Sequence, residues 1–254
     1  MRSVHPRLRA AALVFAGAAV LLPCWANAPL SSLVQVPVAE RNESDDRWCH
    51  TFSVAAYDPA AKEWGVATAS RVLAVGSIVP WGKPGMGVVA TQSYANLTFG
   101  DRGLELLQQG KTAEQVVQQL VEGDADRGVR QLAIVDREGK PAAFTGDDCI
   151  QWHGQKLGDH YVCVGNLLAG PEVLDAMSKA FEAAKGPLAW RLVAALEAAD
   201  EAGGDRRGKQ SAALLVVGEK VDPLGYGNTN LRVDDHAAPV KELARLLQVA
   251  LPRP

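Results

Sequence analysis

The order of strand-like and helix-like stretches constrains this chain more than any single motif. The sequence reads as strands, two helices, strands, two helices and strands, which is typical of an α+β domain. The strand-like runs are 51–59, 64–70, 86–92, 130–136, 141–145, 161–165, 211–217 and 231–233. The helical stretches are 99–109, a second that begins at Thr112, two that follow Gly170-Pro171 and Gly186-Pro187, and 239–251.

The connections between these stretches predict how they pack. Short turns between strands, such as 137–140, favour antiparallel sheets. Gly110 ends one helix, and Thr112 with Gln115 opens the next as a capping box, so these two helices are expected to form an antiparallel pair. Helices that follow one another in pairs along the sequence suggest one helical layer on the outer face of each sheet. The predicted fold is therefore an α+β, four-layer αββα sandwich of two antiparallel sheets between helix layers.

Proline and glycine predict two local features. Pro171 and Pro187 are expected at the first positions of their helices, where a missing N–H costs nothing. Residues 80–85 contain two prolines and two glycines, and this composition predicts a loop that leads into the strand at 86–92.

The N-terminus has the three parts of a secretory signal peptide. Residues 1–10 carry three arginines and no acid, 11–22 are an apolar run, and 26–28 form a small-x-small cleavage site. The apolar run is too short to cross a bilayer comfortably. The predicted organisation is a signal peptide over 1–28, a linker or pro-segment over 29–50 and one folded domain over 51–254.

Charge and composition limit the partners of the exported chain. Loss of residues 1–28 changes the formal net charge from −3 to −6. A mildly acidic chain without basic clusters argues against binding to nucleic acid or to anionic membranes. Pro23 before Cys24 makes a poor lipidation site, so no membrane anchor is expected in the mature form. We expect a periplasmic or secreted protein that acts on a small-molecule or peptide substrate; whether it forms a homo-oligomer stays open.

Cysteine and acidic residues give no sign of a metal or a cofactor. Once Cys24 leaves with the signal, Cys49, Cys149 and Cys163 remain, without C-x-x-C spacing. One disulfide among them is compatible with an oxidising compartment, but the sequence does not select the pair. Asp234-Asp235-His236 resembles a ligand cluster, yet adjacent residues on a strand point to opposite faces, and a polar turn is preferred. We expect neither a metal nor a cofactor.

Thr51 stands at the start of the first strand-like run, directly after the predicted spacer. A threonine that becomes a new N-terminus carries nucleophile and base on one residue, because its own α-amine can accept the hydroxyl proton. The reference pKa of such an amine is about 7.7 to 8.0, so much of it is free base near neutral pH. Thr51 is therefore a candidate catalytic nucleophile. The alternative is a β-branched residue that merely opens a strand.

Four polar residues are candidate partners of Thr51. Ser70, Gln92 and Ser211 end or begin strands near the expected position of the Thr51 strand, and could hydrogen-bond to its amine; strand-end polar residues are the alternative. Asn166 follows a strand, and its side-chain amide is a candidate oxyanion donor for an attacked carbonyl. The alternative for Asn166 is a turn residue that caps its own backbone.

A glycine-rich loop before the run 211–217 carries Asp205, Arg206 and Arg207. In this loop one arginine could bind a substrate carboxylate through two donors while Asp205 orients it. The alternative is a solvated loop with one internal ion pair. The site interpretation is preferred because the same motif recurs in the family described next.

Five ordered motifs resemble an uncharacterised bacterial family, the domain of unknown function 1028 family. They are Thr-Phe-Ser-Val-Ala at 51–55, Gly-Val-Val-Ala-Thr-Gln at 87–92, Gly-Asn-Leu-Leu-Ala-Gly at 165–170, Gly-Gly-Asp-Arg-Arg-Gly-Lys-Gln-Ser-Ala at 203–212 and Leu-Arg-Val-Asp-Asp-His at 231–236. The resemblance covers residues 51 to 251 and implies a fold like that of the N-terminal-nucleophile (Ntn) hydrolases. In many members of this family the threonine follows the initiator methionine directly. Here fifty residues precede it, so exposure of Thr51 requires a cut after His50.

Two functions are compatible with these observations. The first is an amidohydrolase that uses an N-terminal Thr51 as nucleophile on an amide bond of a small molecule or peptide. The second is a catalytically inactive exported binding or storage protein on the same fold, with Thr51 still in mid-chain. Residues 29–50 discriminate between them, because only the enzyme requires their removal.

Overall fold

The computed structural model describes residues 48–219 and 228–252 of the chain, and only the backbone of Trp48. Contacts divide the chain into residues 1–40 and 41–254, and every described residue belongs to the second unit. The predicted signal peptide over 1–28, with Cys24, and residues 29–47 of the predicted linker lie outside the described residues.

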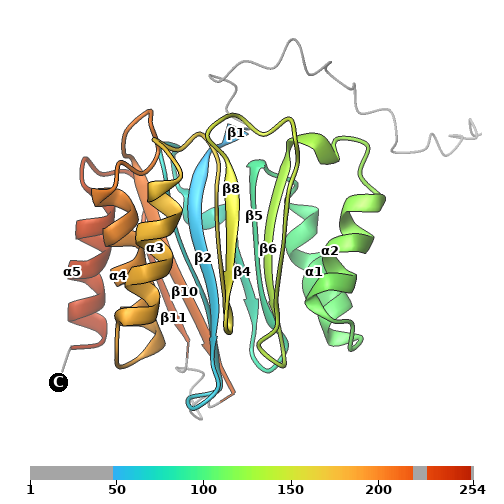
Figure 1. The fold of residues 1–254 in the computed structure, drawn as a ribbon. Coiled ribbons are helices and arrows are strands. Elements are labelled where there is room, and N and C mark those ends of the chain that lie inside the picture. The colour runs from blue at the N-terminus through green and yellow to red at the C-terminus, as the bar shows by residue number, and fades with distance from the viewer. Residues whose placement is uncertain (1–47, 220–227, 253–254) are drawn as a thin grey trace, which may run out of the picture. The chain divides into compact units, whose positions relative to one another are not determined.

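The described residues form two antiparallel sheets (Figure 1). In the five-stranded sheet the order is β1-β5-β6-β7, and β4 also pairs with β5. Its strands are β1 (Trp48–Cys49), β4 (Pro80–Lys83), β5 (Gly87–Tyr94), β6 (Arg130–Asp136) and β7 (Pro141–Thr145). The order of the six-stranded sheet is β11-β10-β3-β2-β9-β8. Its strands are β2 (Thr51–Asp58), β3 (Glu63–Ser70), β8 (Gly154–Gly158), β9 (Tyr161–Gly165), β10 (Ser211–Gly218) and β11 (Thr229–Val233).

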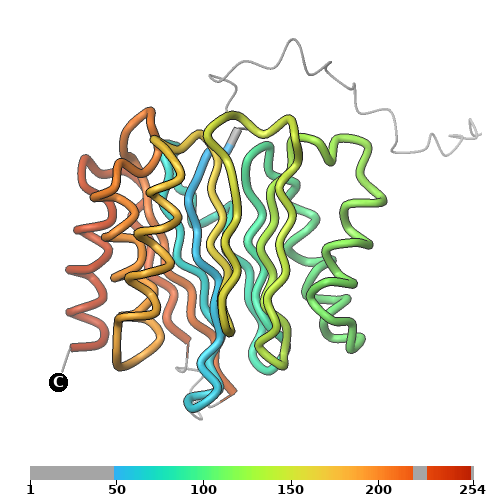
Figure 2. Tube along the Cα trace, in the orientation of Figure 1, coloured from blue at the N-terminus to red at the C-terminus, as the bar shows by residue number. Residues whose placement is uncertain are grey.

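The register of the six-stranded sheet brings residues from distant parts of the chain into one row. Thr51 at the start of β2 pairs with Ser70 at the end of β3, and Ser70 in turn pairs with Ser211 at the start of β10. Figure 2 shows the consequence in colour, with the blue β2 close to orange strands from the C-terminal part of the chain. The predicted proximity of these three strand ends is confirmed.

Helices cover the outer faces of the sheets (Figure 1). The described residues contain α1 (Thr98–Gln108), α2 (Ala113–Glu122), α3 (Glu172–Ala183), α4 (Leu188–Glu201) and α5 (Pro239–Ala250). Two short 3₁₀ helices, η2 (Val75–Ser77) and η3 (Arg127–Val129), precede β4 and β6. The pair α1 and α2 packs on the five-stranded sheet, and α3, α4 and α5 pack on the six-stranded sheet.

Alternating side chains build three apolar clusters. Ala55 and Val88 belong to the cluster between the sheets, whereas their neighbours Val54 and Val89 belong to the clusters beneath the helices. This alternation follows from the two-residue period of a strand. All four side chains are fully buried, and burial of a Val stabilises the fold by about 1.5–3 kcal/mol. The apolar clusters thereby hold β2 and its first residue in a fixed position.

One local prediction is confirmed, two are corrected, and one strand was missed. Thr112 and Gln115 form the predicted capping box at the start of α2. Residues 80–85 were expected to be a loop, but Pro80–Lys83 form β4, which pairs with β5 through only one edge and therefore tolerates proline and glycine. Pro171 and Pro187 occupy the N-cap positions rather than the first helical positions. The polar edge strand β8 was not predicted, because its exposed residues lack an apolar alternation.

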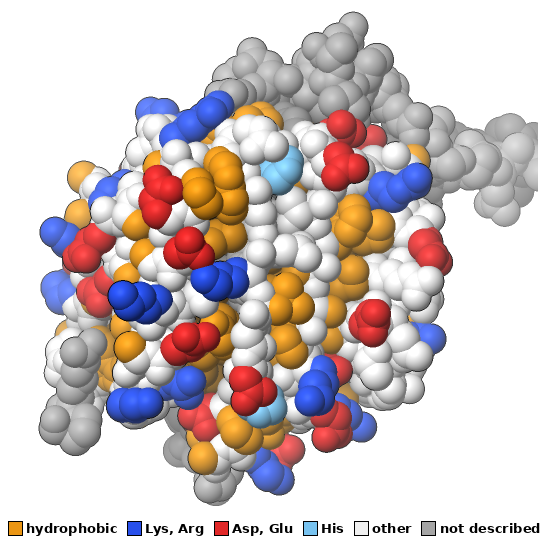
Figure 3. Space-filling model, viewed as in Figure 1, with side chains coloured by type: hydrophobic (Ala, Val, Ile, Leu, Met, Phe, Trp, Pro, Cys, Tyr) orange, Lys and Arg blue, Asp and Glu red, His pale blue; other side chains and the backbone are white. Residues whose placement is uncertain are grey.

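The surface facing the viewer in Figure 3 carries charged side chains over the helices on the left and around the lower rim. The middle of this face is mostly uncharged. Within residues 48–219 and 228–252, no helix is long and apolar enough to pass through a membrane.

Candidate active site

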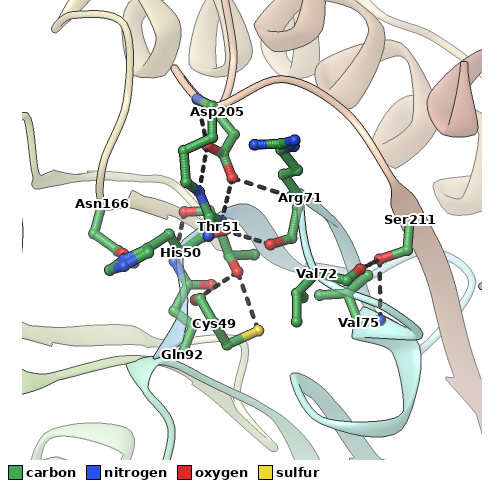
Figure 4. A network of polar contacts seen from close by, with 12 residues as sticks. Cys49, His50, Thr51, Arg71, Val72, Val75, Gln92, Asn166, Asp205 and Ser211 are labelled. Carbon is green, nitrogen blue, oxygen red and sulfur yellow. Dashed lines mark hydrogen bonds and ion pairs between the residues drawn. The ribbon is translucent and has the colours of Figure 1, made fainter. Parts of the chain in front are cut away.

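Thr51 begins β2 and its side chain is fully buried. Its hydroxyl Oγ1 donates to the carbonyl oxygen of Cys49 at 2.6 Å, and the Cys49 sulfur lies 3.3 Å from the same hydroxyl (Figure 4). Because β1 pairs with β5, Trp48 and Cys49 are part of the five-stranded sheet. The candidate nucleophile is therefore enclosed by the segment that precedes it in the chain.

Two donors converge on the carbonyl oxygen of His50, which is the carbonyl of the His50–Thr51 peptide bond. One is the Ser70 hydroxyl, and the other is Arg207 Nη2 at 3.2 Å. Hydrogen bonds from preorganised donors draw electron density toward a carbonyl oxygen and stabilise the negative charge that forms when a nucleophile attacks the carbon. This arrangement thus polarises the one amide bond whose cleavage would make Thr51 N-terminal.

Asp205 holds Arg207 in place through a two-point ion pair. Arg207 Nε lies 3.1 Å from Asp205 Oδ1, and Nη2 lies 2.7 Å from Oδ2. The Asp205 side chain is almost fully buried, and it also accepts from the backbone N–H of Arg71 at 3.0 Å. A fork of this kind fixes the plane of the guanidinium, which a lysine cannot reproduce.

The shape of the 203–208 loop comes from its glycines and from a neighbouring motif. Gly204 and Gly208 have φ of 51° and 116°, which L-residues with side chains rarely adopt. The loop docks on the segment after β9, where Asp205 forms a bridge with Leu168 and the Arg206 N–H donates to Leu167 at 3.0 Å. The two motifs at 165–170 and 203–212 therefore build one side of the site together.

Buried amide side chains form the other side. Gln92 Nε2 donates to the Thr51 carbonyl at 3.1 Å and to Gln131 Oε1 at 2.8 Å. Asn166 Nδ2 donates to the same Gln131 oxygen at 2.9 Å, and its Oδ1 lies 2.8 Å from His50 Nδ1. An amide oxygen only accepts, so His50 Nδ1 donates in this contact. A continuous polar network thus connects His50, Thr51 and three strands of the two sheets.

The structure brings most of the predicted site residues together but changes their contacts. Ser70 and Gln92 were expected to contact the Thr51 amine; they donate instead to the carbonyls on either side of it. Of the two arginines, it is Arg207 that forms the fork with Asp205, while the Arg206 side chain is exposed.

Ser211 lies in the same strand row as Thr51, but its hydroxyl serves the backbone after β3. It donates to the Val72 carbonyl at 2.5 Å and accepts from the Val75 N–H at 3.1 Å. These contacts hold the 71–75 segment, whose first N–H binds Asp205. Ser211 thus supports the site indirectly, through the segment whose N–H binds Asp205.

Three site residues were not singled out from the sequence. Cys49 and His50 were assigned to the removable segment, and both are buried against Thr51. Gln131 lies in the middle of the site, where its amide also donates to the Gly165 carbonyl at 2.9 Å. A glutamine inside the apolar run of β6 was a signal that a buried strand carries a polar function.

The cysteines are thiols in this structure. Cys49, Cys149 and Cys163 are buried, and each has a free sulfhydryl. Burial raises the pKa of the Cys49 thiol to about 11, against the opposing hydrogen bond of Thr51. Cys49 is therefore protonated near neutral pH and a poor nucleophile.

Among the residues that the structure describes, no group of three or more histidine, cysteine or acidic side chains is placed to hold a metal ion. Asp234 is paired with Arg232 at 2.9 Å, and His236 Nδ1 accepts from the Ala238 N–H at 3.0 Å. The segment 234–236 is a polar turn before α5, as the sequence predicted.

The fold and the site define an α+β protein of two antiparallel sheets with a buried polar cluster around the first residue of β2. The chain belongs to the family of unknown function DUF1028, whose family model matches residues 51–243. The match begins at Thr51.

Two solved structures illustrate what the chain is similar to. Protein SPO2555 from Silicibacter pomeroyi, a DUF1028 protein, is 35% identical, with a TM-score of 0.73 over 79% of this chain and 86% of that chain. Anbu, the ancestral β-subunit from Yersinia bercovieri, is 14% identical, with a TM-score of 0.36 over 80% of this chain and 98% of that chain. The second similarity is too low to carry an argument about function. No curated protein matches the chain.

Proposed function

We propose that this protein is an exported amidohydrolase of the Ntn type, with a four-layer αββα fold and Thr51 as its N-terminal nucleophile. The proposal rests on one observation above all. The carbonyl before Thr51 receives donors from Ser70 and Arg207, so the surrounding groups are arranged for attack on an acyl carbon beside the Thr51 hydroxyl.

Cleavage of the His50–Thr51 bond creates the active form. The free α-amine then accepts the proton of the Thr51 hydroxyl, and Oγ1 attacks the carbonyl carbon of a substrate amide. The C–N bond breaks, the leaving nitrogen takes the proton, and an ester joins the acyl group to Thr51. Water hydrolyses this ester, releases a carboxylic acid and restores the hydroxyl. On the opposite side of the site, Gln92 donates to the Thr51 carbonyl, and Asn166 donates to the Gln131 side-chain oxygen that Gln92 also binds.

A second candidate function has its own support. Thr51 is fully buried and its hydroxyl is occupied by the Cys49 carbonyl, as expected of a binding or storage protein in which Thr51 stays in mid-chain. A hollow of about 590 Å³, lined by residues that include Arg127, Phe144 and Asp148, offers such a protein a ligand site away from Thr51.

Covalent labelling of Thr51 tests the proposal without knowledge of the substrate. A β-lactone probe should add one mass to the peptide that begins at Thr51. The labelling rate should rise with pH through the titration of the α-amine and then level, because only the neutral amine accepts the hydroxyl proton.

Two variants serve as controls. Thr51→Ser keeps a hydroxyl and should retain labelling, whereas Thr51→Val preserves the shape of the side chain and should abolish it. Absence of labelling in protein proven to begin at Thr51 would favour the binding protein. A label on a cysteine instead of Thr51 would move the nucleophile elsewhere.

A further inference from the structure

We infer that residues 48–50 occupy the place in which the acyl half of a substrate binds, so that the mature site accepts an extended peptide acyl group. This inference rests on the proposed function and adds the substrate class to it. It comes from the contacts that the preceding segment makes with each functional group of the site.

Cys49 and His50 form hydrogen bonds with the candidate nucleophile, with the carbonyl donors and with the amide network. The Cys49 carbonyl accepts from the Thr51 hydroxyl, and the His50 carbonyl accepts from Ser70 and Arg207. The His50 ring donates to Asn166 Oδ1 at 2.8 Å (Figure 4). Ordinary spacer residues would not meet the nucleophile, the carbonyl donors and the amide network at once. The segment thus fills the site as a substrate would.

The backbone of the segment is bound as a strand. Trp48 pairs with Tyr94 and Cys49 pairs with Ser93, whereas β4 covers the same edge of β5 only from Gly87 to Ala90. Departure of residues 48–50 therefore opens the end of the β5 edge. An open strand edge binds an extended peptide through main-chain hydrogen bonds, and the adjacent side-chain sites supply specificity.

The environment of each residue indicates which acyl group the site prefers. Cys49 is buried in the apolar cluster between the sheets, so a small apolar side chain suits that position. His50 lies against an acceptor, the Asn166 oxygen, so a side chain with an N–H donor suits the position at the cut. After cleavage the terminal group is a carboxylate, which Arg207 should bind more tightly than a neutral carbonyl. The predicted class is an extended peptide acyl group with a polar, N–H-bearing last residue.

Protection of Thr51 against labelling tests this assignment. The tripeptide acetyl-Trp-Cys-His with a free carboxylate, in excess and with a reductant, should slow β-lactone labelling of the cleaved protein. With the peptide at about ten times its dissociation constant, the labelling rate should fall about tenfold, because only the unoccupied site reacts. Acetyl-Cys-His-Trp has the same composition and should protect much less. Acetyl-Trp-Cys-Leu lacks the N–H donor and should fall between them.

Direct binding gives a second readout. Calorimetry should detect the tripeptide acid on the cleaved protein and not on the uncut Thr51→Val chain, in which residues 48–50 still fill the site. Equal binding to both proteins, or equal protection by the reordered peptide, would overturn the inference and leave the proposed function intact. A chain that stays uncut, or a cleaved chain whose Thr51 is never labelled, would overturn the proposed function itself and this inference with it.

Discussion

The Thr51 hydroxyl donates to the carbonyl oxygen of Cys49, two residues earlier in the chain, at 2.6 Å. The candidate nucleophile is therefore bonded to the very segment whose removal would activate it. The contact keeps the hydroxyl away from other acceptors as long as the chain is intact. Four predictions follow from this region and from the scaffold around it.

The mature protein is expected to begin at Thr51, because only a free α-amine makes this residue a nucleophile with its own base. Intact mass and N-terminal sequencing of exported protein measure this directly. If Thr51 itself performs the cut, Thr51→Ala should accumulate the longer form, while Thr51→Ser should still be cut. An N-terminus near Pro29 that is stable for days would contradict the prediction. Equally fast trimming of the Ala variant would assign the cut to another protease.

Ser70→Ala and Arg207→Lys should each slow the cleavage after His50. The first variant removes the hydroxyl that donates to the His50 carbonyl oxygen. The second loses the two-point pair with Asp205 that positions the arginine donor on the same oxygen. Loss of one such donor is expected to cost about tenfold or more in rate. The time course of the longer form by mass spectrometry gives the rate, and the melting temperature checks folding.

Arg245→Lys is the matched control for this series, because it breaks a similar two-point pair, with Glu242, on the exposed side of α5. Its cleavage rate should equal that of the natural chain. Arg206→Lys should have a smaller effect than Arg207→Lys, since Asp205 is paired with Arg207. A larger effect at Arg206 would mean that Arg206, and not Arg207, is the functional arginine of the loop.

Asp124→Asn should destabilise the fold near neutral pH by about 2 kcal/mol, because it leaves the mostly buried Arg130 without its closest carboxylate partner, at 2.7 Å. Burial raises the pKa of Asp124, but the hydrogen bonds from Arg130, from the Asp126 N–H and from Asn96, together with the Arg130 charge, outweigh it and hold this pKa below its usual range. A depressed carboxyl pKa contributes stability above the unfolded value of about 3.9 and loses it as the pH falls further.

Urea unfolding of the natural chain and the Asn variant at several pH values measures this contribution. The difference between the two should be full near neutral pH and shrink as the pH falls below about 4. Glu242→Gln, in a surface pair with the exposed Arg245, should change the stability little at any pH. A difference that stays constant into acid would mean that the Asp124 charge is not the source of the stability.

The thiols should resist alkylation in the folded, uncut protein, which still carries Cys49. Burial raises the pKa of Cys49 and of Cys149 to about 11, and it raises the pKa of Cys163 further. Since the thiolate is the reactive form, iodoacetamide near pH 8 should modify these residues far more slowly than an ordinary thiol with a pKa of about 8.5. Peptide mapping before and after unfolding measures the protection. Rapid alkylation of Cys49 alone would show that residues 48–50 leave their place while still attached to Thr51.

The sequence by itself determined the features that depend on neighbouring residues. The capping box of Thr112 and Gln115 and the strand that opens at Thr51 follow from local hydrogen bonding and side-chain periodicity, and both are confirmed. The sequence also allows the position of Ser70 opposite Thr51 to be predicted. β2 and β3 form a hairpin, and a short turn fixes the register of a hairpin.

Only the tertiary structure decided which groups meet at the His50 carbonyl and which arginine Asp205 selects. Arg207 reaches His50 across 157 residues of sequence, and the docking of its loop on Leu167 and Leu168 turns Arg207 rather than Arg206 toward the site. No local pattern encodes that choice, because adjacent residues in a loop have the same sequence environment. Arg206 and Arg207 differ only in the direction of their side chains, which the packing of the loop backbone sets.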